Sequence, residues 1–92
     1  MSNRVVDRPE ASRYELVQDG QVLGYLDYRP RDGAVELPHT VVDPAHRGQG
    51  LAAELVGAAL DDLRANGARV IPTCWYVAEF IGSHTDYQDL LV

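Results

Sequence analysis

A short glycine-containing loop near the middle of the chain has the composition of a phosphate-binding site. Two glycines, Gly48 and Gly50, stand immediately before an amphipathic segment that begins at Leu51. The first turn of a helix carries unpaired backbone N–H groups and a partial positive charge, and glycine lets an anion approach the backbone closely. Arg47 can add a bidentate contact to a phosphate oxygen. The loop therefore predicts an anion site built from the backbone amides of residues 48–52.

Two common phosphate-binding motifs do not fit this loop. The dinucleotide-binding pattern G-x-G-x-x-G is not matched, and three strand-like segments precede the glycines where that motif has one. A P-loop requires a lysine, whereas all eight basic residues of this chain are arginines. From the residues alone, a plain glycine turn before a helix, with Arg47 paired to Asp43, is an equally good interpretation.

The composition favours a single small acidic domain. The chain has 92 residues, 46% of them hydrophobic, and a formal net charge of −6, which argues against non-specific nucleic-acid binding. One cysteine, Cys74, excludes an intrachain disulfide and a zinc site made of paired cysteines, and we expect no metal. No apolar run reaches the ~20 residues needed to cross a bilayer. We expect one cytoplasmic domain over residues 1–92, without a membrane partner and with residues 1–11 flexible. A monomer is favoured, and a homodimer is the alternative.

The segments before the loop have the pattern of an antiparallel meander. Residues 12–18, 22–29 and 34–42 are strand-like, and turn residues such as Asp19-Gly20 join them. Pro38 lies inside the third segment and has no N–H group to donate, so the pattern predicts an edge position or a bulge there.

The segments after the loop predict a crossover helix and a parallel strand. Apolar residues recur at helical spacing from Leu51, and Asn66-Gly67 is a natural helix stop. A strand over 68–73 follows, then a short helix over 75–81, with one more helical turn within residues 84–91. A strand–helix–strand unit favours parallel pairing with a right-handed crossover. The fold class is therefore α+β, with the apolar helix face made by Leu51, Ala52, Leu55, Val56, Ala59, Leu60 and Leu63.

The loop resembles the acetyl-coenzyme A signature of the GNAT superfamily, Q/R-x-x-G-x-G/A, which opens a helix after a meander. Here the signature is Arg47-x-x-Gly50-x-Ala52. The chain also looks like the small YjdJ-type branch of that superfamily, the N-acetyltransferase domain-containing protein 1-like branch. The likeness departs at Thr85, where the branch usually has proline. The stretches that carry it are residues 24–28, 39–42, 47–52, 72–77 and 84–87.

The resemblance implies a minimal GNAT-like fold that binds acetyl-coenzyme A and transfers acetyl to an amine, either a small molecule or a group on a protein. In that fold a bulge splays the strand before the signature from the next parallel strand. The pantetheine arm lies in the gap, which implies contacts with Val41 and Val42, and Pro38 is a local reason for such a break. The pyrophosphate then lies on the backbone of Gly48, Gln49, Gly50, Leu51 and Ala52, beside Arg47.

The resemblance also implies catalytic roles for three side chains. His39 borders the acetyl group, and an imidazole with a pKa near ~6.5 suits a general base. Cys74 is placed near the acetyl carbon and can accept the acetyl group if its thiolate is stabilised. Tyr76 is a candidate proton donor to the leaving thiolate. Direct transfer to the amine and transfer through Cys74 both stay open.

Each of these side chains also has a structural interpretation. His39 alternates with Leu37 and Val41, which predicts a histidine on the apolar side of its strand unless a bulge turns it. A lone cysteine is most often an inert small hydrophobe. We expect Trp75 and Tyr76 in the core under the last helix. A non-catalytic module that binds coenzyme A or an acyl-coenzyme A is the alternative function, because the chain is short for the superfamily.

Overall fold

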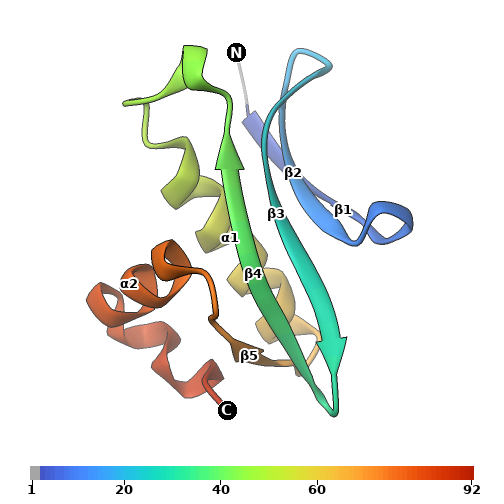
Figure 1. Ribbon diagram of the computed structural model, residues 1–92, viewed down its shortest axis with the longest axis vertical. Helices are drawn as coiled ribbons and strands as arrows, with labels where there is room; N and C mark the ends of the chain where they lie inside the picture. Colours follow the sequence, from blue (N-terminus) through green and yellow to red (C-terminus); the bar gives the residue numbers. More distant parts are fainter. Residues whose placement is uncertain (1–2) are drawn as a thin grey trace.

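The computed structural model describes residues 3–92, which form a mixed α+β fold (Figure 1). A five-stranded sheet has the order β1-β2-β3-β4-β5, with the first four strands antiparallel to their neighbours and β5 parallel to β4. The predicted meander, crossover helix, parallel strand and short second helix are confirmed. The elements are β1 Asn3–Arg8, β2 Arg13–Gln18, β3 Gln21–Arg31, β4 Ala34–Val42, α1 Leu51–Ala65, β5 Arg69–Ile71 and α2 Trp75–Ser83, with 3₁₀ helices η1 Pro9–Ala11, η2 Pro44–His46 and η3 Thr85–Leu90.

Strand β1 adds a fourth strand to the predicted meander. It pairs with β2 along its whole length, from Asn3 opposite Gln18 to Arg8 opposite Arg13. The sequence analysis treats residues 1–11 as a flexible segment outside the sheet, and for residues 3–11 the structure differs. The reason is that the open edge of β2 supplies backbone partners that the polar local pattern does not reveal. Met1 and Ser2 lie outside the described residues.

Strand β4 carries the bulge predicted at Pro38. Its register with β3 passes from Asp27 opposite His39 to Arg29 opposite Glu36, so two residues of β4 face one residue of β3. An extra residue on one strand reverses the alternation of its side chains beyond that point. The bulge therefore decides which side chains of the last part of β4 face the core.

The bulge also marks the place where β4 separates from its parallel neighbour. The two strands pair only over residues 34–36 of β4 and 69–71 of β5. The last backbone link is a hydrogen bond of 2.9 Å from the N–H group of Cys74 to the carbonyl of Leu37. Beyond it, β4 and the start of α2 diverge, as the resemblance implies for this fold.

The core lies between the sheet and the two helices. Helix α1 covers one face of the sheet, and α2 packs against α1 and β4 (Figure 1). Leu16, Leu26 and Leu37 from the sheet are fully buried, and so is the apolar face predicted for α1 apart from Ala52, which is half-buried. Within residues 3–92, no helix is both long and apolar enough to cross a membrane.

Candidate functional site

The amino end of α1 presents a row of unpaired backbone donors. Gly50 precedes the helix and offers no side chain to cap it. The first backward link of the helix runs from the N–H group of Glu54 to the carbonyl of Gly50, at 3.2 Å. Among residues 3–92, no partner accepts a hydrogen bond from the backbone N–H groups of residues 48–53. These donors are therefore available to an anion.

Glycine is required in this loop for its backbone conformation. Gly48 has a φ angle of 82° and Gly50 one of 74°, in the left-handed region that other residues rarely adopt. A Cβ atom built on either glycine would meet no heavy atom within 4 Å. The space above both residues is open, so a ligand can reach the backbone there.

The loop borders a small cavity that continues into a larger one. The first cavity, about 150 Å³, adjoins Arg47, Gly48, Gly50 and Leu51. The second, about 310 Å³, lies between the end of β4 and the start of α2. Both share lining residues, so we treat them as one feature, the β4–α2 groove. The residues shared are Val42, Arg47, Ala52 and Tyr76.

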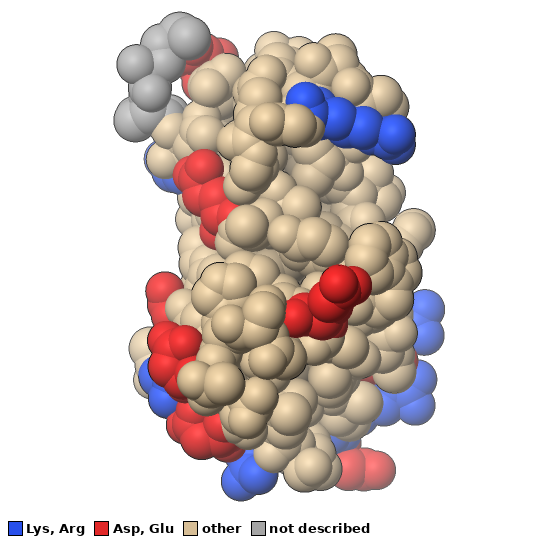
Figure 2. Space-filling view, turned by 90° about the vertical axis from the view of Figure 1, so that its left-hand side faces the viewer, with Lys and Arg blue, Asp and Glu red and all other residues tan. Residues whose placement is uncertain are grey.

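The groove brings most of the predicted coenzyme contacts together. Val41 lines its larger part, whereas Gln49 is exposed on the loop and lines neither cavity. Figure 2 looks onto this side of the molecule, where a basic side chain near the top right and an acidic one near the middle stand out from a broad uncharged surface. Within residues 3–92, no three His, Cys, Asp or Glu side chains are placed to hold a metal ion.

Cys74 lies in the wall of the groove at the start of α2. It is the residue that precedes the helix, and only 8% of its surface is exposed. Its Sγ atom is 3.4 Å from Oγ1 of Thr40, on the facing strand β4. The bulge in β4 creates this contact, because it turns Thr40 toward the core side of the sheet.

The environment of Cys74 favours the thiolate on balance. Burial raises the pKa of the thiol, but the hydrogen bond with Thr40 and the backbone N–H groups of Val77, Tyr76 and Thr40 lower it further than burial raises it. The net pKa lies below the ordinary value for cysteine. The N–H groups of Val77 and Tyr76 belong to the first turn of α2, where the partial positive charge of a helix favours a thiolate.

His39 does not reach the groove. Its side chain is 64% exposed, and its Nδ1 atom lies 3.6 Å from a carboxylate oxygen of Asp27 on β3. Alternation alone would place His39 on the apolar side with Leu37, but the bulge lies between the two residues and turns His39 outward, which is the alternative that the sequence left open. Thr40 faces the core in its place, and His39 faces outward on the opposite side of the sheet. The structure therefore does not bring His39 and Cys74 together.

Tyr76 stands where the two parts of the groove meet. Its ring is half-buried, and it packs edge-on against Trp75 with ring centres 5.8 Å apart. Burial, and secondarily the negative charge of Glu79, raise the pKa of the Tyr76 phenol above its ordinary value. The phenol therefore keeps its proton at neutral pH and can donate it.

Sequence reasoning missed two groups that line the site. Thr40 contacts Cys74. The sequence held a signal for this contact, because a bulge at Pro38 reverses the alternation of side chains and turns Thr40 toward the core. Trp75 was expected in the core but is 74% exposed. The buried face of α2 is formed by Val77, Phe80 and Ile81 at helical spacing, and Trp75 lies off that stripe.

Comparisons with solved structures place the fold among known ones. The solution structure of a GCN5-like protein from Staphylococcus aureus has a TM-score of 0.74, covers 100% of this chain and 91% of its own, and shares 23% identity. The crystal structure of a GNAT family acetyltransferase from Brucella melitensis in complex with acetyl-CoA has a TM-score of 0.61 and 29% identity. It covers 78% of this chain and 54% of its own.

Comparisons of sequence identify the family. Protein NATD1 from Bos taurus is 45% identical over 47 residues, and Protein NATD1 from Homo sapiens is 40% identical over 47 residues. These alignments span 51% of this chain and 42% of each relative, less than half of the relatives' length. The family model of the GCN5-related N-acetyl-transferases matches residues 13–90. The resemblance to the GNAT superfamily is thus confirmed, and the chain belongs to the GCN5-related N-acetyltransferase family.

Proposed function

We propose that this chain binds acetyl-coenzyme A and transfers its acetyl group to an amine. The unpaired N–H groups at the amino end of α1 carry the proposal, because a pyrophosphate is the kind of anion such a helix end binds. The complex of the Brucella melitensis relative with acetyl-CoA supports the choice of ligand. The proposal takes a monomer as the active unit, because every group it uses lies in one chain.

The groove accounts for the separate parts of the ligand. The backbone of residues 48–52 and the guanidinium of Arg47 would hold the pyrophosphate. The pantetheine arm would follow the groove along Val42 and Ala52 in place of a strand partner. The thioester would then lie between β4 and Cys74, in the larger cavity of about 310 Å³.

Direct transfer is our first mechanism. The bound ligand supplies an activated acetyl group as its thioester. Tyr76, which keeps its proton at neutral pH, would give that proton to the departing thiolate. The acceptor amine must lose a proton as its nitrogen bonds to the acetyl carbon. Water is the base that the geometry favours, because His39 faces away from the groove.

Transfer through Cys74 is the second mechanism, and the lowered pKa of its thiol favours it. The Cys74 thiolate would bond to the acetyl carbon as the bond to the coenzyme sulfur breaks, and Tyr76 would protonate the released thiolate. The acceptor amine would next attack the acetyl group on Cys74. That step forms the amide, releases the Cys74 thiolate, and passes the amine proton to water.

Mass measurement on the intact protein separates the two mechanisms. We expect acetyl-coenzyme A to raise the melting temperature of the wild-type protein, since only the folded state binds it. An acetyl adduct that disappears in Cys74→Ala would establish the covalent route, and turnover by Cys74→Ala would establish the direct one.

Stabilisation without turnover on small amines and protein amines would identify a binding module. No stabilisation at millimolar ligand would overturn the proposal.

A further inference from the structure

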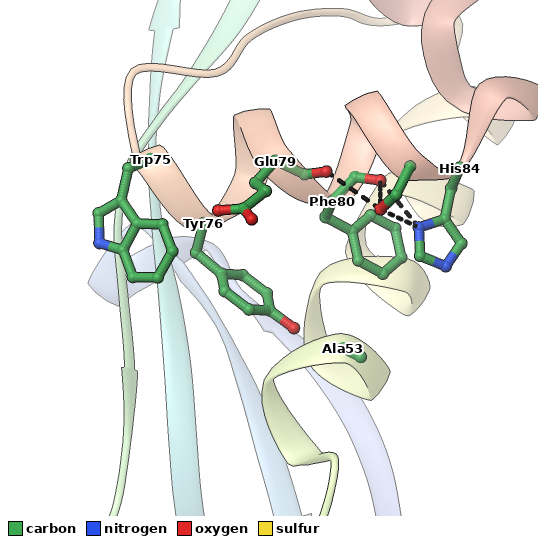
Figure 3. Close-up of a pocket in the computed structure, with 7 residues that line it drawn as sticks. Ala53, Trp75, Tyr76, Glu79, Phe80 and His84 are labelled. Carbon is green, nitrogen blue, oxygen red and sulfur yellow. Dashed lines mark hydrogen bonds between the residues drawn. The ribbon is translucent and has the colours of Figure 1, made fainter.

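The cavity between α1 and α2 is part of the ligand site described above, because Trp75 and Tyr76 line both this cavity and the β4–α2 groove (Figure 3). A different surface lies at the far edge of the sheet, where β1 is the outermost strand (Figure 1). The residues that line the groove include none from β1 or β2. This edge of the sheet is therefore separate from the ligand site.

Strand β1 is an open edge that the rest of the fold holds in place. It pairs with β2 on one side, and no strand among residues 3–92 pairs with its other side. On the face toward α1, Val5 packs against the core, and the side chain of Asp7 accepts a hydrogen bond of 2.7 Å from the Tyr28 hydroxyl. Every second residue of an edge strand directs its N–H and C=O groups away from the sheet, so β1 offers a preformed ladder to another strand.

The opposite face of β1 alternates between positive charge and apolar surface. Arg4, Val6 and Arg8 lie on that face, at the two-residue spacing of one side of a strand. On β2, Arg13 is directly opposite Arg8, and Glu15 is opposite Val6. We call Arg4, Arg8, Arg13 and Glu15 the arginine patch.

Glu15 fixes two of the three guanidinium groups of the arginine patch. Its carboxylate lies 2.7 Å from the Arg13 guanidinium and 3.2 Å from Nε of Arg8, and only 7% of the residue is exposed. The hydrogen bond from Arg13 lowers the pKa of the Glu15 carboxyl against the effect of burial, so Glu15 stays charged at neutral pH. The Arg13 guanidinium also stacks on the ring of Tyr25, 4.5 Å from its centre. One carboxylate among three arginines leaves the patch positive, in a chain whose formal net charge is −6.

We propose that the open edge of β1 binds an extended acidic segment of a partner protein, with acidic side chains opposite Arg4 and Arg8 and an apolar one opposite Val6. In this mode of binding, backbone hydrogen bonds supply affinity and the alternating side chains supply specificity. Opposite charges that face each other across a strand pair are stabilising and like charges are destabilising, so the arginines exclude basic strands. The partner segment therefore has the pattern acidic–x–apolar–x–acidic. The inference does not depend on acetyl transfer, because the edge is separate from the groove.

A nucleic acid and a second copy of this chain are the competing occupants. A phosphate backbone binds through many basic contacts along its length, whereas this patch has three arginines, two of them separated by an apolar residue. Two copies of β1 paired antiparallel about Val6 would set Arg4 of each copy against Arg8 of the other, and like charges in that position are destabilising. Both observations favour an acidic protein segment.

Titration of the nitrogen-15-labelled protein with capped peptides, followed through its backbone amide resonances, measures this binding. We expect a peptide of sequence ETVTE to shift the amide resonances of residues 3–8 in a saturable way. The peptide TEVET has the same composition and charge, but its acidic residues lie on the other face of the strand when its valine meets Val6. It should therefore bind about tenfold more weakly than ETVTE.

Exchange of charge at one position tests the register of the bound peptide. Arg4→Gln should weaken the binding of ETVTE roughly threefold, and Arg4→Glu should reverse the preference, so that ETVTR binds more tightly than ETVTE. The matched control is Arg64→Gln, an equal loss of charge in the last turn of α1, and it should leave the affinity unchanged.

Any of four results would overturn the inference: no saturable shift with ETVTE, equal affinities for ETVTE and TEVET, equal effects of Arg4→Gln and Arg64→Gln, or larger shifts of the same amides by oligothymidylate of the same charge. Self-association of the free protein through residues 3–8 would assign the edge to a second copy instead. Coenzyme A enters none of these titrations, so a failure here is distinct from a failure of the proposed function.

Discussion

Helices α1 and α2 both begin at the edge of the β4–α2 groove, but the backbone N–H groups of their first turns have different surroundings. Gly50 precedes α1 and leaves the backbone N–H groups of residues 51–53 without partners. Cys74 precedes α2, and its sulfur lies within the influence of the first N–H groups of that helix. The partial positive charge at the amino end of each helix therefore acts on a different group.

This difference has a physical meaning. At α1 the glycine conformation keeps protein atoms away, so the partial positive charge acts on an anion from outside the chain. At α2 the charge acts on a sulfur atom of the protein itself, and Thr40 adds a hydrogen bond from β4. The amino end of α1 is therefore suited to bind an anion, whereas the amino end of α2 changes the reactivity of the Cys74 thiol.

The largest effect is expected when Gly50 is replaced by glutamate. Gly50→Glu places a carboxylate beside the donors of α1, and we expect coenzyme A affinity to fall roughly 100-fold, since hydrogen bonds to charged groups contribute about 1.5–3 kcal/mol each. Calorimetric titration with coenzyme A measures the loss. The alkylation rate of Cys74 should stay at the wild-type value, because α2 is untouched.

Gly50→Gln is the matched control for that substitution. It has the same size and carries the same backbone strain, about 1–2 kcal/mol for a side chain at positive φ, but it has no charge. We expect it to bind at least tenfold more tightly than Gly50→Glu. Equal affinities would mean that charge at the end of α1 does not matter, and would remove the basis of the phosphate assignment.

A smaller effect is expected at Arg47, whose side chain is exposed beside the donors of α1. Arg47→Gln removes one charged contact, so affinity for coenzyme A should fall about tenfold, with a weaker dependence on salt. Arg4→Gln, an exposed position on β1, removes the same charge and should not change affinity. If both variants lose affinity alike, net charge is responsible and Arg47 makes no direct contact.

The smallest effect is expected at the amino end of α2, which Cys74 precedes. Thr40→Val keeps the shape of the side chain but removes the hydrogen bond to Cys74. The thiolate then loses a stabilising partner, so the pKa of the thiol rises and less thiolate is present at neutral pH. The rate of alkylation by iodoacetamide, followed against pH, should shift its midpoint upward.

Thr40→Ser tests whether the hydroxyl itself is responsible. It restores the hydrogen bond, and the midpoint should return to the wild-type value. Coenzyme A affinity should be little changed in either variant, because α1 keeps its free donors. An unchanged midpoint in Thr40→Val would show that the start of α2 alone lowers the thiol pKa.

Local patterns in the sequence were enough to predict the end of α1 that would bind the anion. Consecutive turns and strand-like segments define the meander, the two glycines set the left-handed loop, and the apolar spacing from Leu51 defines the helix. All of these depend on interactions between residues close in the chain. The bulge at Pro38 belongs with them, because proline cannot donate to the ladder wherever its strand lies.

Contacts between distant segments decided which side chains line the groove. His39 and Thr40 are adjacent in sequence, and a single bulged residue opposite β3 turns one outward and the other onto Cys74, 34 residues away. Trp75 is exposed because α2 turns Val77, Phe80 and Ile81 toward the core. Side-chain direction depends on the register of a strand and on the face of a helix that a neighbour covers, and both are set only when the layers pack.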